Sequence, residues 1–270
     1  MVGVSMPGSR RAIALALWIA SMLPFVATLG YEFTYDDHWT IESNAWLLRS
    51  PGQVLSAMVH GEGTRVGIPD ASRPLMVLSN LFDRRVFGLH PAFHHAHSVL
   101  LHGVASVLAA ALAFVILRDR RAALFAGLFF GVAPIHAEVV ASVHYREDLL
   151  ATIGLFAYLA CVFAPSARPH DVRRAWLASA SLAFGLLGKE SAIVAVPALA
   201  VLALGRPASF FRRRERTWVG TVVVLLLYGS WRIGLTMNGD GVARGAPLSL
   251  PDALVRSARA LLDGAVDVVV

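Results

Sequence analysis

Three long uncharged runs, at 12–30, 98–117 and 149–167, constrain this chain more than any other feature of its sequence. Crossing about 30 Å of hydrocarbon takes about 20 helical residues, which is close to the length of each run. The whole chain has 270 residues, of which 56% are hydrophobic and 16% charged, so it is too apolar for an ordinary soluble domain of this size. We therefore predict an all-α fold, a polytopic membrane helical bundle.

Shorter apolar runs raise the predicted number of membrane-spanning helices to about seven. We interpret the first run as a retained span, since it lacks the small-residue cleavage site of a signal peptide. We expect a transmembrane module over 1–235, followed at 236–270 by an outer loop and the start of a further span. The shorter runs lie at 122–137, 175–188, 191–205 and 217–231.

Basic residues mark alternate connections between these runs and so predict the orientation. Four segments hold 13 of the 24 Lys and Arg residues, namely Arg10–Arg11, 118–121, 168–174 and 206–216. Cytoplasmic loops are enriched in Lys and Arg, so these segments predict a cytoplasmic N-terminus. The net charge of +6 is spread between apolar runs instead of over one polar face, which argues against nucleic-acid binding.

Most of the acidic residues, 15 of 18, and most histidines then fall on the opposite, outer side. The largest outer segment, 31–91, contains a short apolar piece at 73–82 that predicts an interfacial or re-entrant helix. The single cysteine, Cys161, lies in an apolar run and excludes both an internal disulfide and a multi-thiolate metal site.

An adjacent acidic pair, Asp36 and Asp37, follows the first apolar run. It is typical of a solvated, helix-capping pair. A carboxylate held at the edge of a membrane can also serve as a general base for a hydroxyl nucleophile, because partial burial raises its pKa. The sequence leaves both interpretations open.

Two further clusters of polar residues interrupt the apolar pattern, one in the stretch 134–151 and one at Lys189 and Glu190. Charged groups near membrane depth are expensive unless they pair or face water, so they are functional candidates as well as candidates for ion-paired turns. Lys189, the chain's single lysine, stands beside Glu190 and suits either a phosphate ligand or an internal ion pair. The stretch 134–151 contains His136, Glu138, His144, Arg146, Glu147 and Asp148.

Histidines also cluster at the start of the second long run. His95 and His102 are seven residues apart, so they share one helix face, with His94 and His97 nearby. Their spacing lacks a compact His-x3-His pair with a carboxylate ligand, which disfavours zinc or copper, and we expect them to line a cavity. We assign no metal ligands and no certain cofactor, and leave a divalent cation open.

Taken together, these motifs resemble the GT-C membrane glycosyltransferases. The chain is most similar to the transmembrane-and-tetratricopeptide O-mannosyltransferase family and its bacterial relatives. The motifs that carry the resemblance are "YDD" at 35–37, "RP" at 73–74, His95 with His102, "PIHAEVVASVHYREDLLA" at 134–151 and "GKES" at 188–191.

The resemblance implies an enzyme that moves a sugar, such as mannose, from a polyprenyl- or dolichyl-phosphate carrier to a protein or glycan hydroxyl, with inversion, outside the cytoplasm. It makes Asp36 and Asp37 catalytic. The expected substrate- or phosphate-binding residues are Arg73, His95, His102, His136, Glu138, Arg146, Asp148, Lys189 and Glu190.

Two departures from the family and one compositional trend complete the prediction. Ser98 stands where relatives often have Asn, and no tetratricopeptide repeats follow, so we expect a shortened member of the family. The strong preference for Arg over Lys suggests a bacterial protein of the inner membrane with a periplasmic site. The alternative is a non-catalytic membrane subunit or a transporter, in which the buried charges form an ion path or hold helices together.

Overall fold

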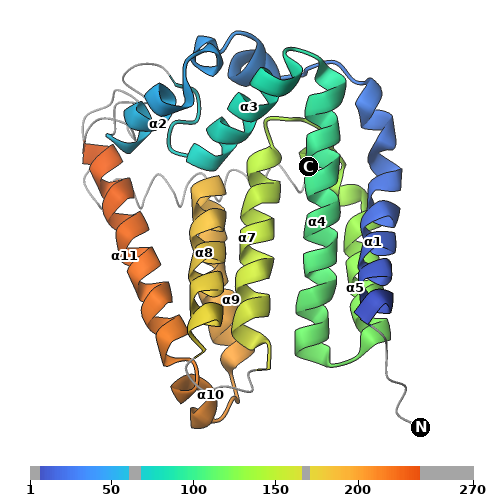
Figure 1. The fold of residues 1–270 in the computed structure, drawn as a ribbon, viewed down its shortest axis with the longest axis vertical. Helices are drawn as coiled ribbons and strands as arrows, with labels where there is room; N and C mark the ends of the chain where they lie inside the picture. The colour runs from blue at the N-terminus through green and yellow to red at the C-terminus, as the bar shows by residue number, and fades with distance from the viewer. Residues whose placement is uncertain (1–6, 61–67, 166–170, 238–270) are drawn as a thin grey trace, which may run out of the picture.

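The computed structural model describes residues 7–60, 68–165 and 171–237, and within these ranges the chain is helical and contains no strand. Most of the long helices run side by side along the long axis of the molecule (Figure 1). The predicted all-α helical bundle is therefore confirmed. The expected outer loop and further span at 236–270 lie almost entirely outside the described residues.

The N-terminal part of the bundle is built from α1 (Pro7–Met22), α4 (Pro91–Leu117) and α5 (Arg120–Val132). Pro24 follows α1, and the chain continues as a 3-10 helix over Leu23–Gly30. Close packing depends on small residues: a Cβ atom added to Gly131 would lie 2.4 Å from Cβ of Ser21. After α5 the chain bends through Pro134 into α6 (Ala137–Ala141).

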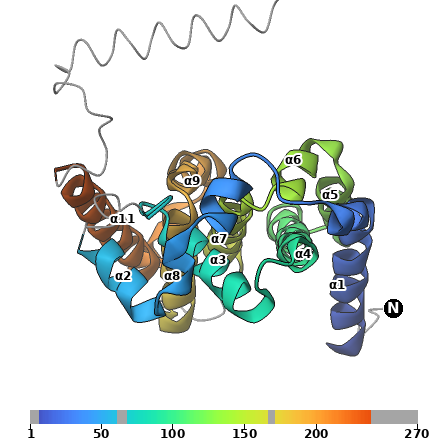
Figure 2. The same cartoon turned by 90° about the horizontal axis from the view of Figure 1, so that it is seen from above.

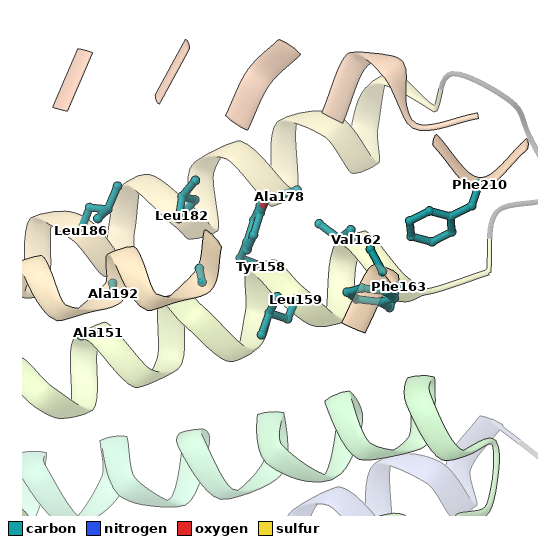
Figure 3. Packing of buried hydrophobic residues seen from close by; sticks show 12 residues of the cluster. Ala151, Tyr158, Leu159, Val162, Phe163, Ala178, Leu182, Leu186, Ala192 and Phe210 are labelled. Atoms are coloured by element: carbon teal, nitrogen blue, oxygen red, sulfur yellow. The ribbon is translucent and has the colours of Figure 1, made fainter. Parts of the chain in front are cut away.

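The C-terminal part contains α7 (Arg146–Phe163), α8 (Val172–Gly188), α9 (Ala195–Ala203) and α11 (Glu215–Met237), with the short α10 (Ala208–Arg212) before α11. Its apolar core lies chiefly between α7 and α8, where Tyr158, Leu182 and Leu186 are fully buried (Figure 3). Phe210 of α10 stacks on Phe163 and closes this core at one end.

The segment between α1 and α4 forms a cap on one end of the bundle. Its main helices are α2 (Pro51–Val59) and α3 (Pro74–Phe87), which share a small core containing Leu47, Met58 and Leu81. Seen from above, α3 lies over the ends of α7 and α8 (Figure 2). The helix predicted from the apolar piece at 73–82 is thus present, and it lies across the bundle end.

The seven-span count is not confirmed. Three helical segments are long and apolar enough to cross a membrane: Arg11–Gly30, Pro91–Leu117 and Glu215–Leu235. A fourth exists if Arg120–Val132 and Pro134–Ala141, which meet at a bend of 47°, form one broken span. Helices α7 and α8 lie between these segments in the bundle, but α7 begins with three charged residues and α8 has 17 residues.

The two ends of the bundle differ in charge. The turn between α4 and α5 and the region around α10, both rich in Arg, lie at the end away from α2 and α3 (Figure 1). The acidic segments predicted to be on the outer side meet at the capped end, under α3.

Candidate functional site

Asp37 is fully buried and joins the cap to the segment that leads into α7. Its carboxylate accepts hydrogen bonds from the backbone amides of Thr34 (3.2 Å), Val143 (3.4 Å) and His144 (2.7 Å), and from the Ser142 hydroxyl (3.4 Å). Both oxygens are used in holding two distant pieces of backbone together. Asp37 thus fixes the loop that carries the acidic pair against the segment that leads into α7.

Asp36, its neighbour, has a different environment. Its side chain is 67% exposed, and its carboxylate lies 3.6 Å from Nε2 of His144. The other ring nitrogen of His144, Nδ1, lies 3.6 Å from a carboxylate oxygen of Asp70. Asp36 is thus the most exposed carboxylate of the site, and it lies beside a largely buried imidazole that is placed between two acids.

Arg73 continues this line of charges towards α8. It immediately precedes α3 and contacts Asp70 (3.4 Å), Glu147 (2.7 Å) and Glu190 (3.1 Å). Lys189, at the end of α8, contacts Glu147 (2.9 Å) and Asp148 (2.8 Å). Glu147 is therefore shared by both cations.

These contacts form an outer charge cluster made of Asp36, Asp70, Arg73, His144, Glu147, Asp148, Lys189 and Glu190. Burial alone would lower the pKa of Lys189, but hydrogen bonds to Asp148 and Glu147 raise it, so the ammonium group is charged at neutral pH. Arg73 and Lys189 are each about one-fifth exposed, and the guanidinium nitrogens of Arg73 contact carboxylates of the cluster.

Arg146 lies below this cluster and is fully buried. It pairs with Asp83 (2.6 Å), and it donates hydrogen bonds to the hydroxyls of Ser79 and Ser98 and to the carbonyl of His94. All three of its guanidinium nitrogens are thus used inside the protein. The structure places Arg146 as a clamp that joins α3, α4 and α7, and not at a surface where a phosphate could bind.

Asp83, the partner of Arg146, is also fully buried and lies near two histidines. Burial by itself would raise its pKa, but the hydrogen bond from His97 (2.7 Å) and the positive charge of Arg146 lower it. The pair is therefore ionised inside the protein: one oxygen of Asp83 accepts the hydrogen bond from His97, and the other lies 2.6 Å from a guanidinium nitrogen of Arg146.

The remaining predicted residues lie elsewhere at the capped half. His95 is buried, with its ring 6.4 Å from that of Tyr31. Nε2 of His102 donates a hydrogen bond to the carbonyl of Gly131 (2.9 Å). The ring centroid of His102 lies 5.3 Å from that of His136. Glu138 is exposed on α6. No ion pair described in the structure joins these four residues to the outer charge cluster.

Within the described ranges, no group of three or more His, Cys, Asp or Glu side chains is arranged to hold a metal ion. A divalent cation therefore stays an open prediction. The polar network also contains Asp70, His144, Glu147 and Asp83, which the sequence does not predict as site residues. His144 and Glu147 lie in a stretch that the sequence singled out, whereas nothing in the pattern around Asp70 or Asp83 indicates a long-range contact.

Comparisons with curated proteins support the resemblance. Protein O-mannosyl-transferase TMTC2 of Homo sapiens is 30% identical over 199 residues, which cover 70% of this chain and 23% of the human protein. Drosophila melanogaster Tmtc2 is 36% identical over 181 residues (64% of this chain, 19% of the relative), and Tmtc1 of the same fly is 32% identical over 182 residues (64% and 20%).

The chain thus matches about one-fifth of the length of these relatives. No protein-family model matches it, and no solved structure matches it. The relatives named above are animal proteins, so they lend no support to the predicted bacterial origin.

Proposed function

The chain is a relative of the TMTC protein O-mannosyl-transferases, and from this premise we propose that it is a membrane glycosyltransferase that transfers mannose to a protein hydroxyl. One structural observation supports the proposal most directly. The Asp36 loop, the start of α7 and Lys189 are far apart in sequence but meet in one outer charge cluster with an accessible carboxylate.

The donor in this proposal is a polyprenyl- or dolichyl-phosphate sugar, bound with its phosphate at Arg73 and Lys189. Both cations lie at the end of the bundle, where a lipid headgroup would sit while its chain stays in the bilayer. A guanidinium and an ammonium group suit a phosphate, and part of each is exposed. The carboxylates that surround them would hold both side chains in place before the donor arrives.

Asp36 is the proposed general base, since it is exposed while Asp37 is enclosed by hydrogen-bond donors. It would take the proton of the acceptor hydroxyl as the oxygen attacks the anomeric carbon. The bond from that carbon to the carrier phosphate breaks in the same step, so the configuration inverts. Because the phosphate is a good leaving group, positioning and charge stabilisation are the main tasks left to the protein.

The capped end faces away from the cytoplasm in this proposal. The Arg-rich connections lie at the opposite end of the bundle, and such connections are typical of the cytoplasmic side of a membrane. The chain would be an integral membrane protein with its site outside the cytoplasm.

Transfer from a labelled polyprenyl-phosphate mannose to an acceptor peptide, with the protein in a bilayer, tests the proposal. A general base contributes about 10²- to 10⁴-fold in rate, so we expect Asp36→Asn to lower transfer within that range. Glu42→Gln is the matched control, since Glu42 is an exposed acid of the same loop that pairs locally with His38. Its rate should equal that of the unchanged chain.

Two outcomes would contradict the proposal in different ways. Unaltered transfer by the Asp36→Asn variant would remove Asp36 as the base. Absence of transfer by the unchanged chain, with donor and acceptor supplied, would favour a non-catalytic membrane subunit in which the charges hold helices together.

A further inference from the structure

A groove of about 410 Å³ lies at the end of the bundle away from the outer charge cluster. It is bounded by α4, α7 and α8, and both apolar and charged side chains line it. Small side chains line the groove, namely Ala157 and Ala160 of α7 and Ala164 just after it, and Leu108 and Val115 of α4 form one wall. Nothing in the proposed transfer reaction uses this groove.

The mouth of the groove is positively charged. Arg173 and Arg174, in the first turn of α8, line it together with Asp171. Arg174 donates hydrogen bonds to the carbonyls of Ala164 and Pro165, so it is held in place, whereas Arg173 is exposed.

Further arginines surround this end of the molecule. Burial, together with repulsion from Arg174, Arg206 and Arg213, lowers the pKa of Arg214. The Arg-rich segments contain few acids to balance them, since 118–121, 168–174 and 206–216 hold only Asp119, Asp171 and Glu215. An anion at the mouth would therefore meet a positive field.

The outside of the groove is suited to a membrane. Next to Arg173, the side chains of Val172, Trp176 and Leu177 are exposed, and Trp176 is 72% exposed. Exposed tryptophan beside arginine is typical of the boundary between headgroups and hydrocarbon. In the orientation proposed above, the groove would face lipid, and Arg173 would lie at the level of the headgroups.

We propose that this groove is a binding site for an anionic phospholipid, with an acyl chain along α7 and its phosphate at Arg173. Basic pockets between membrane helices are known to bind such headgroups. The ligand is distinct from the sugar donor, because the donor's phosphate must lie at the outer charge cluster, at the other end of the bundle.

Cys161 offers a direct test, since it lines the groove and is the single cysteine of the chain. The probe is N-ethylmaleimide, and the measurement is the rate of Cys161 alkylation by intact-protein mass spectrometry. The protein is placed in nanodiscs of phosphatidylcholine, with and without phosphatidylglycerol. One cation near a membrane surface is worth about 1 kcal/mol, so we expect alkylation to be about five-fold slower with phosphatidylglycerol.

Two controls make the result specific to the groove. Arg173→Gln should abolish the slowing, whereas Arg121→Gln, at an exposed position of the same end outside the groove, should retain it. In a Cys161→Ala background, a cysteine at Leu226 on the exposed face of α11 should react equally fast in both lipids.

Equal rates at Cys161 in the two lipids would overturn the proposal, as would slowing that Arg121→Gln removes to the same degree as Arg173→Gln. The measurement requires no sugar transfer, so it is independent of the proposed enzyme activity.

Discussion

Two aspartates that are adjacent in sequence have opposite environments in the fold. Asp36 is exposed and lies beside His144, while Asp37 is fully buried and accepts hydrogen bonds from three backbone amides and a hydroxyl. Under the proposed function, a mutation of Asp36 would remove the general base, whereas a mutation of Asp37 would disturb the geometry of the loop.

Asp37→Asn tests this division of roles through stability. Asparagine has one acceptor oxygen where the carboxylate has two, so at least one buried donor loses its partner, at a cost of about 1–3 kcal/mol in the free energy of unfolding. Thermal unfolding of the purified protein should show a lower midpoint. Asp36→Asn, at an exposed position, should unfold at the temperature of the unchanged chain, and equal midpoints for both variants would refute the assignment.

The ion pair between Asp83 and Arg146 gives a second prediction at this scale. Removing one member of a buried pair leaves an uncompensated charge and costs about 3–5 kcal/mol, whereas replacing both with apolar residues is often neutral. We expect Asp83→Leu to destabilise strongly and the double variant Asp83→Leu, Arg146→Met to recover most of the loss. Denaturant unfolding of Asp83→Leu, of Arg146→Met and of the double variant measures the coupling between the two residues. If the losses in unfolding free energy of the two single variants add up in the double variant, the prediction is wrong.

At the scale of elements, α7 and α8 approach so closely that glycine is required. A Cβ atom added to Gly154 of α7 would lie 2.4 Å from both the Cα and the backbone nitrogen of Gly185 in α8. Backbone atoms cannot rotate away as a side chain can. This close approach brings Lys189, at the end of α8, to Glu147 and Asp148 at the start of α7.

Gly154→Ala should therefore destabilise the bundle, although alanine is the better helix former. Forcing extra volume into a packed core costs about 1–3 kcal/mol, which exceeds the gain of about 1 kcal/mol in helix propensity. Gly229→Ala in α11 is the control, since a Cβ there meets nothing within 4 Å, and it should leave stability equal or higher. The comparison is between the two thermal midpoints.

For the whole molecule, the charge difference between the two ends predicts that the Arg-rich end faces the cytoplasm. Labelling of single cysteines with a membrane-impermeant maleimide, in a Cys161→Ala background, shows which end of the bundle is accessible from outside the cell. Tyr35, which is 88% exposed at the capped end, and Arg121, which is exposed at the Arg-rich end, are suitable positions. On intact cells we expect Tyr35→Cys to react and Arg121→Cys to react only after permeabilisation, and the reverse pattern would invert the topology.

The sequence alone determined the helical class, the separation of Arg-rich from acidic segments and the residues that carry the family resemblance. These features depend on local composition, since apolar length and loop charge are read along the chain. The predicted count of seven spans is not confirmed, because the lengths of the short apolar runs do not fix where each helix begins and ends.

Only the tertiary structure decided which charged residues face each other. Asp36 and Asp37 have the same chemistry and adjacent positions, yet their burial depends on contacts with residues more than 100 positions away. Arg146 was expected near a phosphate, but its partner Asp83 comes from α3 and encloses it in the interior. Long-range pairing follows from how helices pack against one another, and no local pattern in the sequence specifies it.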